Sequence, residues 1–322
     1  MMLMGIARLG EDAVVSVVLP TYDRPDLLAD AINSVLEQTY DPIEIVVVDD
    51  ASPTPAAETV ESVVPDGVAV RCIRHARNRG ANAARRSGIE AATGEVIAFL
   101  DDDDRWLPEK IAVQVNALRT GEEPPGVALV GQRILGPDGR TRAVKRPRLN
   151  GEVVPGLLTG ETAGPFSVLA VRMAAIERAG LPDLSFPSLQ DREWLLRLAT
   201  EVPFRSDPAV HVERRMGDHD QIGDRFVEKR DVTYEAFLSK HRTTAAAYGL
   251  ERPFERWLAE RVAGSALRAG AYRDAMRFGL RAIRAQPTCW KPYCYLGLAI
   301  GGDFTYQPVV RTKRRVATIR DT

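Results

Sequence analysis

The sequence predicts an α/β fold, with a mostly parallel central sheet and helices on both of its faces, followed by an all-α C-terminal extension. In the N-terminal two thirds, short β-branched apolar runs alternate with segments of helical periodicity, which is typical of a parallel sheet. After about Gly223 the sequence becomes uniformly helical and rich in Ala and Arg. We therefore expect a leader at 1–12, an α/β domain at 13–222 and a helical extension at 223–322.

The expected elements alternate regularly along the chain. The apolar run at 14–19 is typical of a strand buried on both faces, and Pro25 suits the first turn of the helix that follows. The expected strands are 14–19, 43–48, 68–74, 95–100, 127–135 and 165–171. The expected helices are 25–38, 56–64, 80–92, 108–118, a short one ending at Ala179, and 188–199, where Leu189, Trp194, Leu195 and Leu198 lie on or near one face.

Composition excludes several protein classes. The 322 residues carry 43 basic and 44 acidic side chains and 45% apolar residues, which argues against disorder. No apolar run reaches the roughly 20 residues needed to cross a bilayer, and the opening ten residues do not resemble a secretory signal. We therefore expect a cytoplasmic protein. Three scattered cysteines predict free thiols rather than a disulfide framework or a zinc site: Cys72, Cys289 and Cys294.

Charge is distributed unevenly along the chain. Residues 1–110 carry 10 basic and 20 acidic side chains, whereas the remaining residues carry 33 and 24. A basic second half could face an anionic lipid, a phosphorylated acceptor or nucleic acid. An Arg-rich solvated surface explains the same excess.

Polar clusters follow the first four expected strands. They are Pro20-Thr21-Tyr22, Asp49-Asp50-Ala51-Ser52, the stretch 75–80, and the four aspartates Asp101 to Asp104. Because ligands bind beyond the carboxyl ends of strands in such sheets, we expect these clusters to line one cleft.

The four consecutive aspartates indicate a metal site. Neighbouring carboxylates repel one another, and a divalent cation such as Mg²⁺ or Mn²⁺ removes that repulsion. A solvated acidic loop remains an alternative, and Asp104 suits a capping role near the helix expected at 108–118. Asp49-Asp50 suits ribose or base recognition, with a turn-and-cap role beside Ser52 as the alternative.

Motifs of several nucleotide sites and of one hydrolase class are absent from the sequence. The first strand is followed by no GxGxxG, the chain has no GxxxxGK[ST], and no GxSxG nucleophile elbow occurs. What remains is a nucleotide held by side chains beside a carboxylate-bound metal.

Together these residues resemble the family-2 inverting glycosyltransferases of the GT-A fold, from about Val14 to His219. The motifs are VVLPTY at 17–22, VVVDDAS at 46–52, NRG at 78–80 with Ala84-Arg85, FLDDDD at 99–104 with Trp106 and Pro108, and Gln190-Asp191. One departure is Gln190, where the family usually has Glu.

The resemblance implies a role for each matching residue. Asp191 would be the catalytic base, and Asp103 would contact the metal, together with Asp101 and His219. The implied nucleotide-sugar site comprises Pro20, Thr21, Tyr22, Asp50, Asn78, Gly80, Arg85, Asp101 and Asp102. His219 follows the basic pair Arg214-Arg215 of the family's diphosphate loop, although a plain surface histidine is the alternative.

The implied reaction transfers a sugar from a nucleoside-diphosphate sugar, with UDP favoured, to an acceptor hydroxyl or lipid phosphate, with inversion. The implied cofactor is Mn²⁺ or Mg²⁺, and the acceptor would be a glycan, a lipid-linked molecule or a protein, but not nucleic acid. Two alternatives stay open: a haloacid-dehalogenase-like phosphatase and a non-catalytic scaffold. The strand position of the aspartates and the following Asp104-Arg105 argue against the phosphatase.

The helical extension resembles part of a tetratricopeptide unit, although an ordinary helical hairpin is an alternative. The matching residues are Gly270, Tyr272, Ala275, Ala282 and Pro287, then Tyr293, Leu296 and Gly297. Because a solenoid needs about three repeats, we expect the extension to pack on the catalytic domain or on a second copy of the chain. Five basic residues within 311–320 suggest peripheral contact with the inner face of the plasma membrane.

Overall fold

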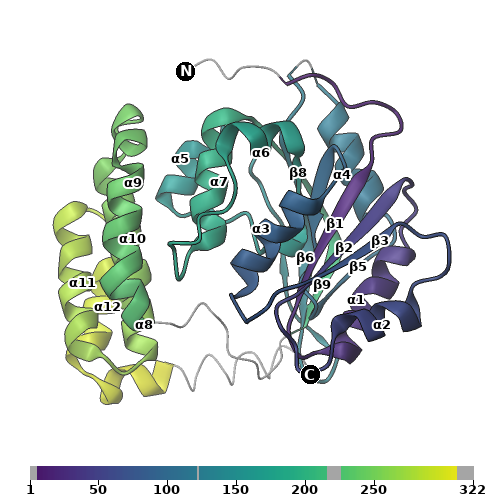
Figure 1. The fold of residues 1–322 in the computed structure, drawn as a ribbon. Coiled ribbons are helices and arrows are strands. Elements are labelled where there is room, and N and C mark those ends of the chain that lie inside the picture. Colours follow the sequence, from purple (N-terminus) through teal and green to yellow (C-terminus); the bar gives the residue numbers. More distant parts are fainter. Residues whose placement is uncertain (1–5, 122, 216–225, 310–322) are drawn as a thin grey trace. The chain divides into compact units, whose positions relative to one another are not determined.

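A computed structural model of the chain describes residues 6–121, 123–215 and 226–309, which fall into two units (Figure 1). The sheet unit comprises residues up to Val154, Thr162–Leu184 and Asp191–Gly217, and the helical unit comprises Pro155–Glu161, Ser185–Gln190 and the chain from Asp218 onward. The boundary expected at 222/223 lies outside the described residues. Two short segments that precede Asp191 in sequence therefore belong to the helical unit.

The sheet unit contains a mixed sheet with the strand order β3-β2-β1-β4-β8-β6-β9-β5, and β7 pairs with β6. Strands β3, β2, β1 and β4 are parallel, β6 and β9 are parallel, and the other neighbours are antiparallel. The strands are β1 Val15–Thr21, β2 Ile43–Asp49, β3 Val70–Arg74, β4 Val96–Phe99, β5 Asp104–Trp106, β6 Val127–Leu135, β7 Thr141–Lys145, β8 Leu169–Arg172 and β9 Phe204–Arg215. The predicted α/β class is confirmed. The sheet is mixed, and parallel pairing predominates among the strands from the first hundred residues.

Helices cover both faces of the parallel strands, which explains why every residue of β1 and β4 is buried. Figure 1 shows α1 and α2 on one side of β1 and β2, and α3 and α7 on the other. The helices of this unit are α1 Pro25–Leu36, α2 Ala56–Val63, α3 Ala81–Ala91, α4 Lys110–Arg119, α6 Met173–Ala179 and α7 Gln190–Glu201, whose first residue belongs to the helical unit. Helix α3 approaches β1 at Gly88, where an added Cβ would lie 2.3 Å from Val18 Cγ1.

The structure differs from the expected elements at several places. Strands β5, β7 and β9 and the short helix α5 (Val154–Thr159) were not expected, and the expected strand at 165–171 begins with a 3-10 turn, Phe166–Val168, before β8. Strand β9 contains Pro208 and alternates poorly, and its pairing with β6 is irregular next to Gly131. Such a proline argues against a strand when the sequence alone is read, because it cannot donate to the ladder.

The helical unit confirms the predicted helical extension. Its elements are α5 Val154–Thr159, α8 Phe226–Glu228, a π-helical turn Lys229–Thr233, α9 Tyr234–Ala247, α10 Glu251–Arg268, α11 Tyr272–Ala285 and α12 Lys291–Ile300. An aromatic core joins α9, α10 and the segment 185–190: the Phe237 ring lies 5.9 Å from Phe186, 5.9 Å from Phe254 and 6.1 Å from Trp257, between centroids. None of the described helices combines the length and apolarity that crossing a membrane requires.

Candidate functional site

The first and fourth polar clusters meet at the carboxyl ends of β1 and β4, which are adjacent strands. Thr21 Oγ1 donates a hydrogen bond to Asp102 Oδ2 at 2.9 Å, and Arg24 pairs with Asp102 Oδ1 at 3.1 Å. Pro20 is buried in β1, whereas Tyr22, one residue beyond the strand, is 45% exposed. The parallel topology thus brings together residues about 80 positions apart, as the strand-end argument predicted.

Three of the four aspartates form a carboxylate cluster. Carboxylate oxygens of Asp101, Asp103 and Asp104 all lie within 4.8 Å of one another. Asp102 is not part of this cluster, because its oxygens face Thr21 and Arg24. Asp104 therefore belongs to the cluster and does not cap the following helix. It lies in β5, is 3% exposed, and is separated from α4, which begins at Lys110.

The cluster stores electrostatic repulsion. Burial, followed by the charges of Asp101 and Asp103, raises the pKa of Asp104 well above its usual value. Burial and the Asp101 charge likewise raise the pKa of Asp103, against the lowering influence of Arg24 and Arg214. Ser167 Oγ donates to Asp104 Oδ2 at 2.5 Å, but the buried Oδ1 of Asp104 has no hydrogen-bond partner among the described residues. A buried, unpaired acceptor beside two other carboxylates suits Mg²⁺ or Mn²⁺, which prefer oxygen ligands.

Arg85 connects α3 to this cluster. Its guanidinium donates to Asp101 Oδ1 at 2.5 Å and lies 4.1 Å above the Phe166 ring, and the side chain is buried. The Phe166 ring in turn stacks on Trp194 of α7, with centroids 6.0 Å apart. The predicted residue Arg85 therefore orients an acidic side chain of the cluster.

Asp191 lies in the first turn of α7, three residues before Trp194. Residues three apart share a helix face, and the Trp194 ring packs edge-on against Phe99, 5.6 Å between centroids, at the end of β4. This packing places the first turn of α7 near the strand that leads into the aspartates. Asp191 is half-buried, and its Oδ1 accepts the backbone N–H of Arg192 at 2.8 Å.

Asp50 is buried and faces the loop that carries Asn78 and Gly80. Its Oδ1 accepts from His75 Nδ1 at 2.7 Å and from the Arg79 backbone N–H at 2.8 Å, and its Oδ2 accepts from the Gly80 backbone N–H at 2.6 Å. His75 Nε2 contacts Ser87 Oγ at 2.9 Å, which ties the loop to α3. Asp50 thus holds the loop through both of its oxygens.

Asn78 and Gly80 are exposed at the N-terminus of α3. The Asn78 side-chain oxygen accepts the Gly80 N–H at 3.2 Å, and Gly80 has a φ of +85°, a conformation that favours glycine. An added Cβ at Gly80 would meet open space, so the backbone conformation alone explains the glycine.

Asp49 has the turn-and-cap role that was an alternative for the Asp49-Asp50 pair. Its carboxylate accepts from the backbone N–H groups of Ser52 and Ala56 at 2.7 and 3.1 Å and pairs with Arg74 at 2.8 Å. Burial raises its pKa, but these hydrogen bonds and the Arg74 charge outweigh burial, and the net pKa is lowered.

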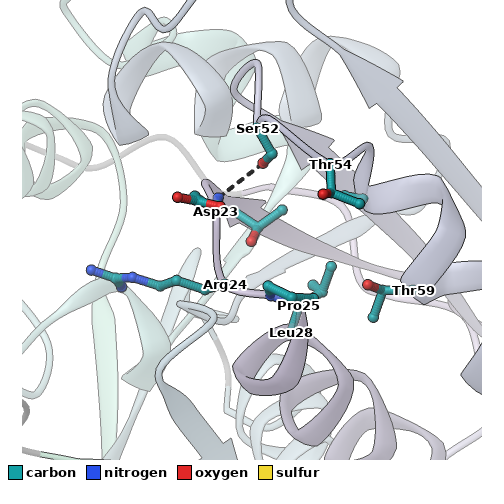
Figure 2. A pocket seen from close by; sticks show the side chains of 9 residues that line it. Asp23, Arg24, Pro25, Leu28, Ser52, Thr54 and Thr59 are labelled. Atoms are coloured by element: carbon teal, nitrogen blue, oxygen red, sulfur yellow. Dashed lines mark hydrogen bonds between the residues drawn. The ribbon is translucent and has the colours of Figure 1, made fainter.

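A pocket opens between the ends of β1 and β2. Figure 2 shows Ser52, Thr54 and Thr59 around the hollow beside Pro25 and Leu28, while the Arg24 guanidinium extends away from it. The Asp23 backbone N–H donates to Ser52 Oγ at 3.0 Å, which connects the two loops. Among the described residues, the non-glycine residues with positive φ are Asp23, Ala51 and Leu189, and the first two lie in the loops that this pocket joins. Strained backbone often accompanies functional loops.

The basic residues before His219 end β9. Arg214 pairs in register with Asp104. Its positive charge partly offsets the rise in the pKa of both Asp103 and Asp104. Arg215 instead forms an ion pair with Asp30 at 2.8 Å. His219 itself lies outside the described residues. The sequence alone did not single out Arg24, His75 and Ser167, because their roles depend on partners far along the chain. The run of four aspartates was the signal that could have placed Asp104 in the metal site as well.

The comparisons agree with this arrangement. Residues 16–177, just over half of the chain, match the model of Glycosyl transferase family 2. TuaG of Bacillus subtilis, a putative teichuronic acid biosynthesis glycosyltransferase, is 26% identical over 180 residues, which cover 56% of this chain and 68% of TuaG. WfaP of Escherichia coli, a UDP-Glc:alpha-D-GlcNAc-diphosphoundecaprenol beta-1,3-glucosyltransferase, is 33% identical over 107 residues, 33% of this chain and 42% of WfaP. Other curated relatives are longer proteins, and the chain spans little more than a third of their length.

Two solved structures share the fold. TarS 1-349 of S. aureus in complex with UDP-GlcNAc has a TM-score of 0.67 at 16% identity and covers 94% of this chain and 91% of that one. The mannosyltransferase PcManGT of Pyrobaculum calidifontis, in complex with GDP-Man and Mn²⁺, has a TM-score of 0.55 at 18% identity, with 99% and 84% covered. The predicted GT-A fold is confirmed, and the family match argues against the phosphatase alternative. With its strand-end carboxylates and with more than half of its length matched, this chain belongs to Glycosyl transferase family 2.

Proposed function

We propose that this glycosyltransferase transfers a sugar from a UDP-sugar to a lipid-linked carbohydrate acceptor, with inversion, and that it depends on Mn²⁺ or Mg²⁺. The observation that carries the proposal is the cluster of Asp101, Asp103 and Asp104 with its unpaired buried oxygen. A divalent cation held by these residues would neutralise the charge that grows on the departing diphosphate. His219 stays a proposed further ligand.

The donor site follows from the neighbouring groups. We infer that the pocket beside Thr21, Ser52 and Thr54 takes the nucleoside, because it offers hydroxyl groups next to apolar walls formed by Pro25 and Leu28. Asp50 contributes by holding the loop of Asn78 and Gly80, and Arg85 contributes by orienting Asp101. Arg214 adds positive charge near the cluster, which suits a diphosphate.

Asp191 is the proposed base. A carboxylate in the first turn of α7 can accept the proton of an acceptor hydroxyl, and attack opposite the leaving group then inverts the anomeric centre. The UDP-sugar preference is supported by the ligand in the TarS complex, and the lipid-linked acceptor by the diphosphoundecaprenol-linked substrate after which WfaP is named. A glycan or protein acceptor is the second candidate, and such a chain would act at the cytoplasmic side of a membrane.

The test is Asp191→Asn, which keeps most capping capacity and nearly the same volume. We expect UDP release in the presence of a lipid-diphosphate saccharide acceptor to fall on the order of 10²-fold or more. Binding of UDP-GlcNAc or UDP-glucose with Mn²⁺, measured by calorimetry, should barely change. Glu201→Gln, at the other end of α7, is the matched control and should retain full turnover.

Two results would contradict this function. Near-normal turnover of Asp191→Asn would move the base to another carboxylate, and lost donor binding would place Asp191 among the donor ligands. If the unmodified protein bound no nucleotide sugar with or without Mn²⁺, the donor proposal itself would fail.

A further inference from the structure

Helix α12 carries an exposed apolar stripe. Trp290 at its N-cap, Tyr293 and Ile300 recur at spacings that place them on one helix face, and they are 68%, 48% and 68% exposed. Phe304, directly after the Gly301-Gly302 turn, is 94% exposed. The opposite face of α12 contains the buried residues Pro292 and Ala299. We call these four exposed residues the α12 stripe.

The stripe is unusual within this protein. The chain has four tryptophans, and Trp106, Trp194 and Trp257 are buried, whereas Trp290 faces solvent. Aromatic side chains bury 150–250 Å² each where they are covered, so leaving Trp290 and Phe304 in water forgoes about that much apolar contact per residue. Adjacent exposed apolar side chains of this size mark interaction sites on soluble proteins.

Charge indicates what covers the stripe. From Arg284 to the C-terminus the sequence has seven basic and two acidic residues, and Lys291 is exposed beside Trp290. The basic residues within 311–320 follow the stripe in sequence, although they lie outside the described residues. A surface with this sign attracts anionic lipid headgroups, whereas two copies facing each other would bring like charges together.

We propose that the α12 stripe, with Lys291 beside it, forms a docking surface for an anionic phospholipid bilayer. The aromatic rings and Ile300 enter the interface between headgroups and acyl chains, and the Lys291 ammonium group stays at the headgroups. Trp and Tyr favour this depth because each ring has an apolar body and a polar edge. The helix lies in the plane of the interface and does not span the bilayer.

The inference extends beyond sugar transfer and can be tested without it. The full-length protein is mixed with vesicles of phosphatidylcholine and phosphatidylglycerol, or of phosphatidylcholine alone, and binding is measured by flotation without donor or acceptor. We expect binding to the anionic vesicles, weaker binding as salt is raised, and little binding to the neutral ones. Because three tryptophans are buried, a blue shift in fluorescence on binding would report on Trp290.

Variants at exposed positions distinguish the contribution of the α12 stripe to vesicle binding from that of nonspecific electrostatic attraction. Ile300→Ser combined with Phe304→Ser should weaken binding to anionic vesicles by about tenfold or more, since both side chains would otherwise enter the apolar boundary. Val144→Ser on β7, an apolar residue that is 48% exposed, is the control and should bind like the unmodified protein. Trp290→Phe should keep most binding and lose the spectral shift.

The proposal fails if binding is absent or is equal on neutral vesicles, or if the double variant binds unchanged. It also fails if ultracentrifugation shows a dimer that the double variant disperses, because the stripe would then be an interface between copies of this chain. Sugar-transfer activity bears on neither result, so loss of the proposed function would leave this proposal standing.

Discussion

Asp104 shows how much depends on a single carboxyl group. It is buried among other carboxylates with one oxygen unpaired, and the raised pKa records an unfavourable environment for its charge. We expect Asp104→Asn to raise the melting temperature of the metal-free protein by about 2–4 °C, the shift that ~1 kcal/mol produces in a domain of this size. The same variant should lose the stabilisation that Mn²⁺ provides.

Scanning calorimetry with and without Mn²⁺ measures both effects. Asp138→Asn is the matched control, because Asp138 is an exposed loop residue paired with Arg142, and it should leave the Mn²⁺ effect intact. An Asp104→Asn protein that Mn²⁺ stabilises as strongly as the unmodified one would remove Asp104 from the metal site.

Acid should weaken metal binding at a higher pH than ordinary carboxylates would. Burial first, and neighbouring carboxylate charge second, raise the pKa of Asp103 and Asp104, so the folded protein takes up protons there before the unfolded chain does. This pair therefore favours folding of the metal-free protein less as pH rises through that window. Conversely, Mn²⁺ must displace those protons, and the melting-temperature gain from Mn²⁺ should shrink as the pH is lowered, starting at a higher pH than for carboxylates of ordinary pKa. A gain that does not vary with pH would contradict this prediction.

At the scale of elements, the close approach of α3 to β1 positions Arg85 and the Asn78–Gly80 loop. An added methyl at Gly88 would clash with the buried Val18 side chain, so Gly88→Ala should destabilise the protein by about 1–3 kcal/mol. Because α3 must shift, the KM for the donor should rise as well. Urea unfolding and donor kinetics measure the two effects.

Arg86→Ala is the control for that helix, since Arg86 is exposed and contacts Glu90 one turn away. Its effect should stay near 0.3–0.5 kcal/mol, typical of such pairs. Equal stability of Gly88→Ala and Arg86→Ala would mean that α3 adjusts without strain.

Features of the site that depend on neighbouring residues could be predicted from the sequence, whereas contacts between residues far apart in the chain could not. The alternation of strands and helices predicted the parallel half of the sheet and its strand-end clusters, because those patterns are local. The inward direction of Asp104 depends on β5, three residues long, and on its pairing with β9 more than 100 residues later. The hydrogen bonds of Asp50 with His75, Arg79 and Gly80 likewise connect elements that no local pattern links. Neither could be predicted from the sequence alone.

At the scale of the whole molecule, two early segments depend on late helices. In the helical unit, Phe186 packs on Phe237, Ser188 Oγ bonds Thr233 Oγ1 at 2.8 Å, and Gly160 lies against Trp257. A chain ending at residue 222 should therefore expose Phe186 and loosen the loop that precedes Asp191. We expect such a chain to melt at a lower temperature and to lose turnover, while Mn²⁺-dependent binding of UDP is retained in part.

A chain ending at Val309 is the control, because every one of those partners is kept. Calorimetry, gel filtration and UDP release distinguish the two truncations. A chain ending at residue 222 that is monomeric, stable and fully active would show that the late helices are dispensable.

The placement of 155–161 and 185–190 in the helical unit also bears on how such proteins diversify. A recombination event that exchanged only the sequence after residue 222 would bring in new helices. The segments 155–161 and 185–190 would remain, although their side chains pack against the original helices. Crossovers at that point should seldom yield viable hybrids, and successful exchanges should carry compensating changes near Phe186 and Gly160. The helical unit is thus expected to be inherited together with the sheet unit, rather than exchanged between proteins as an independent module.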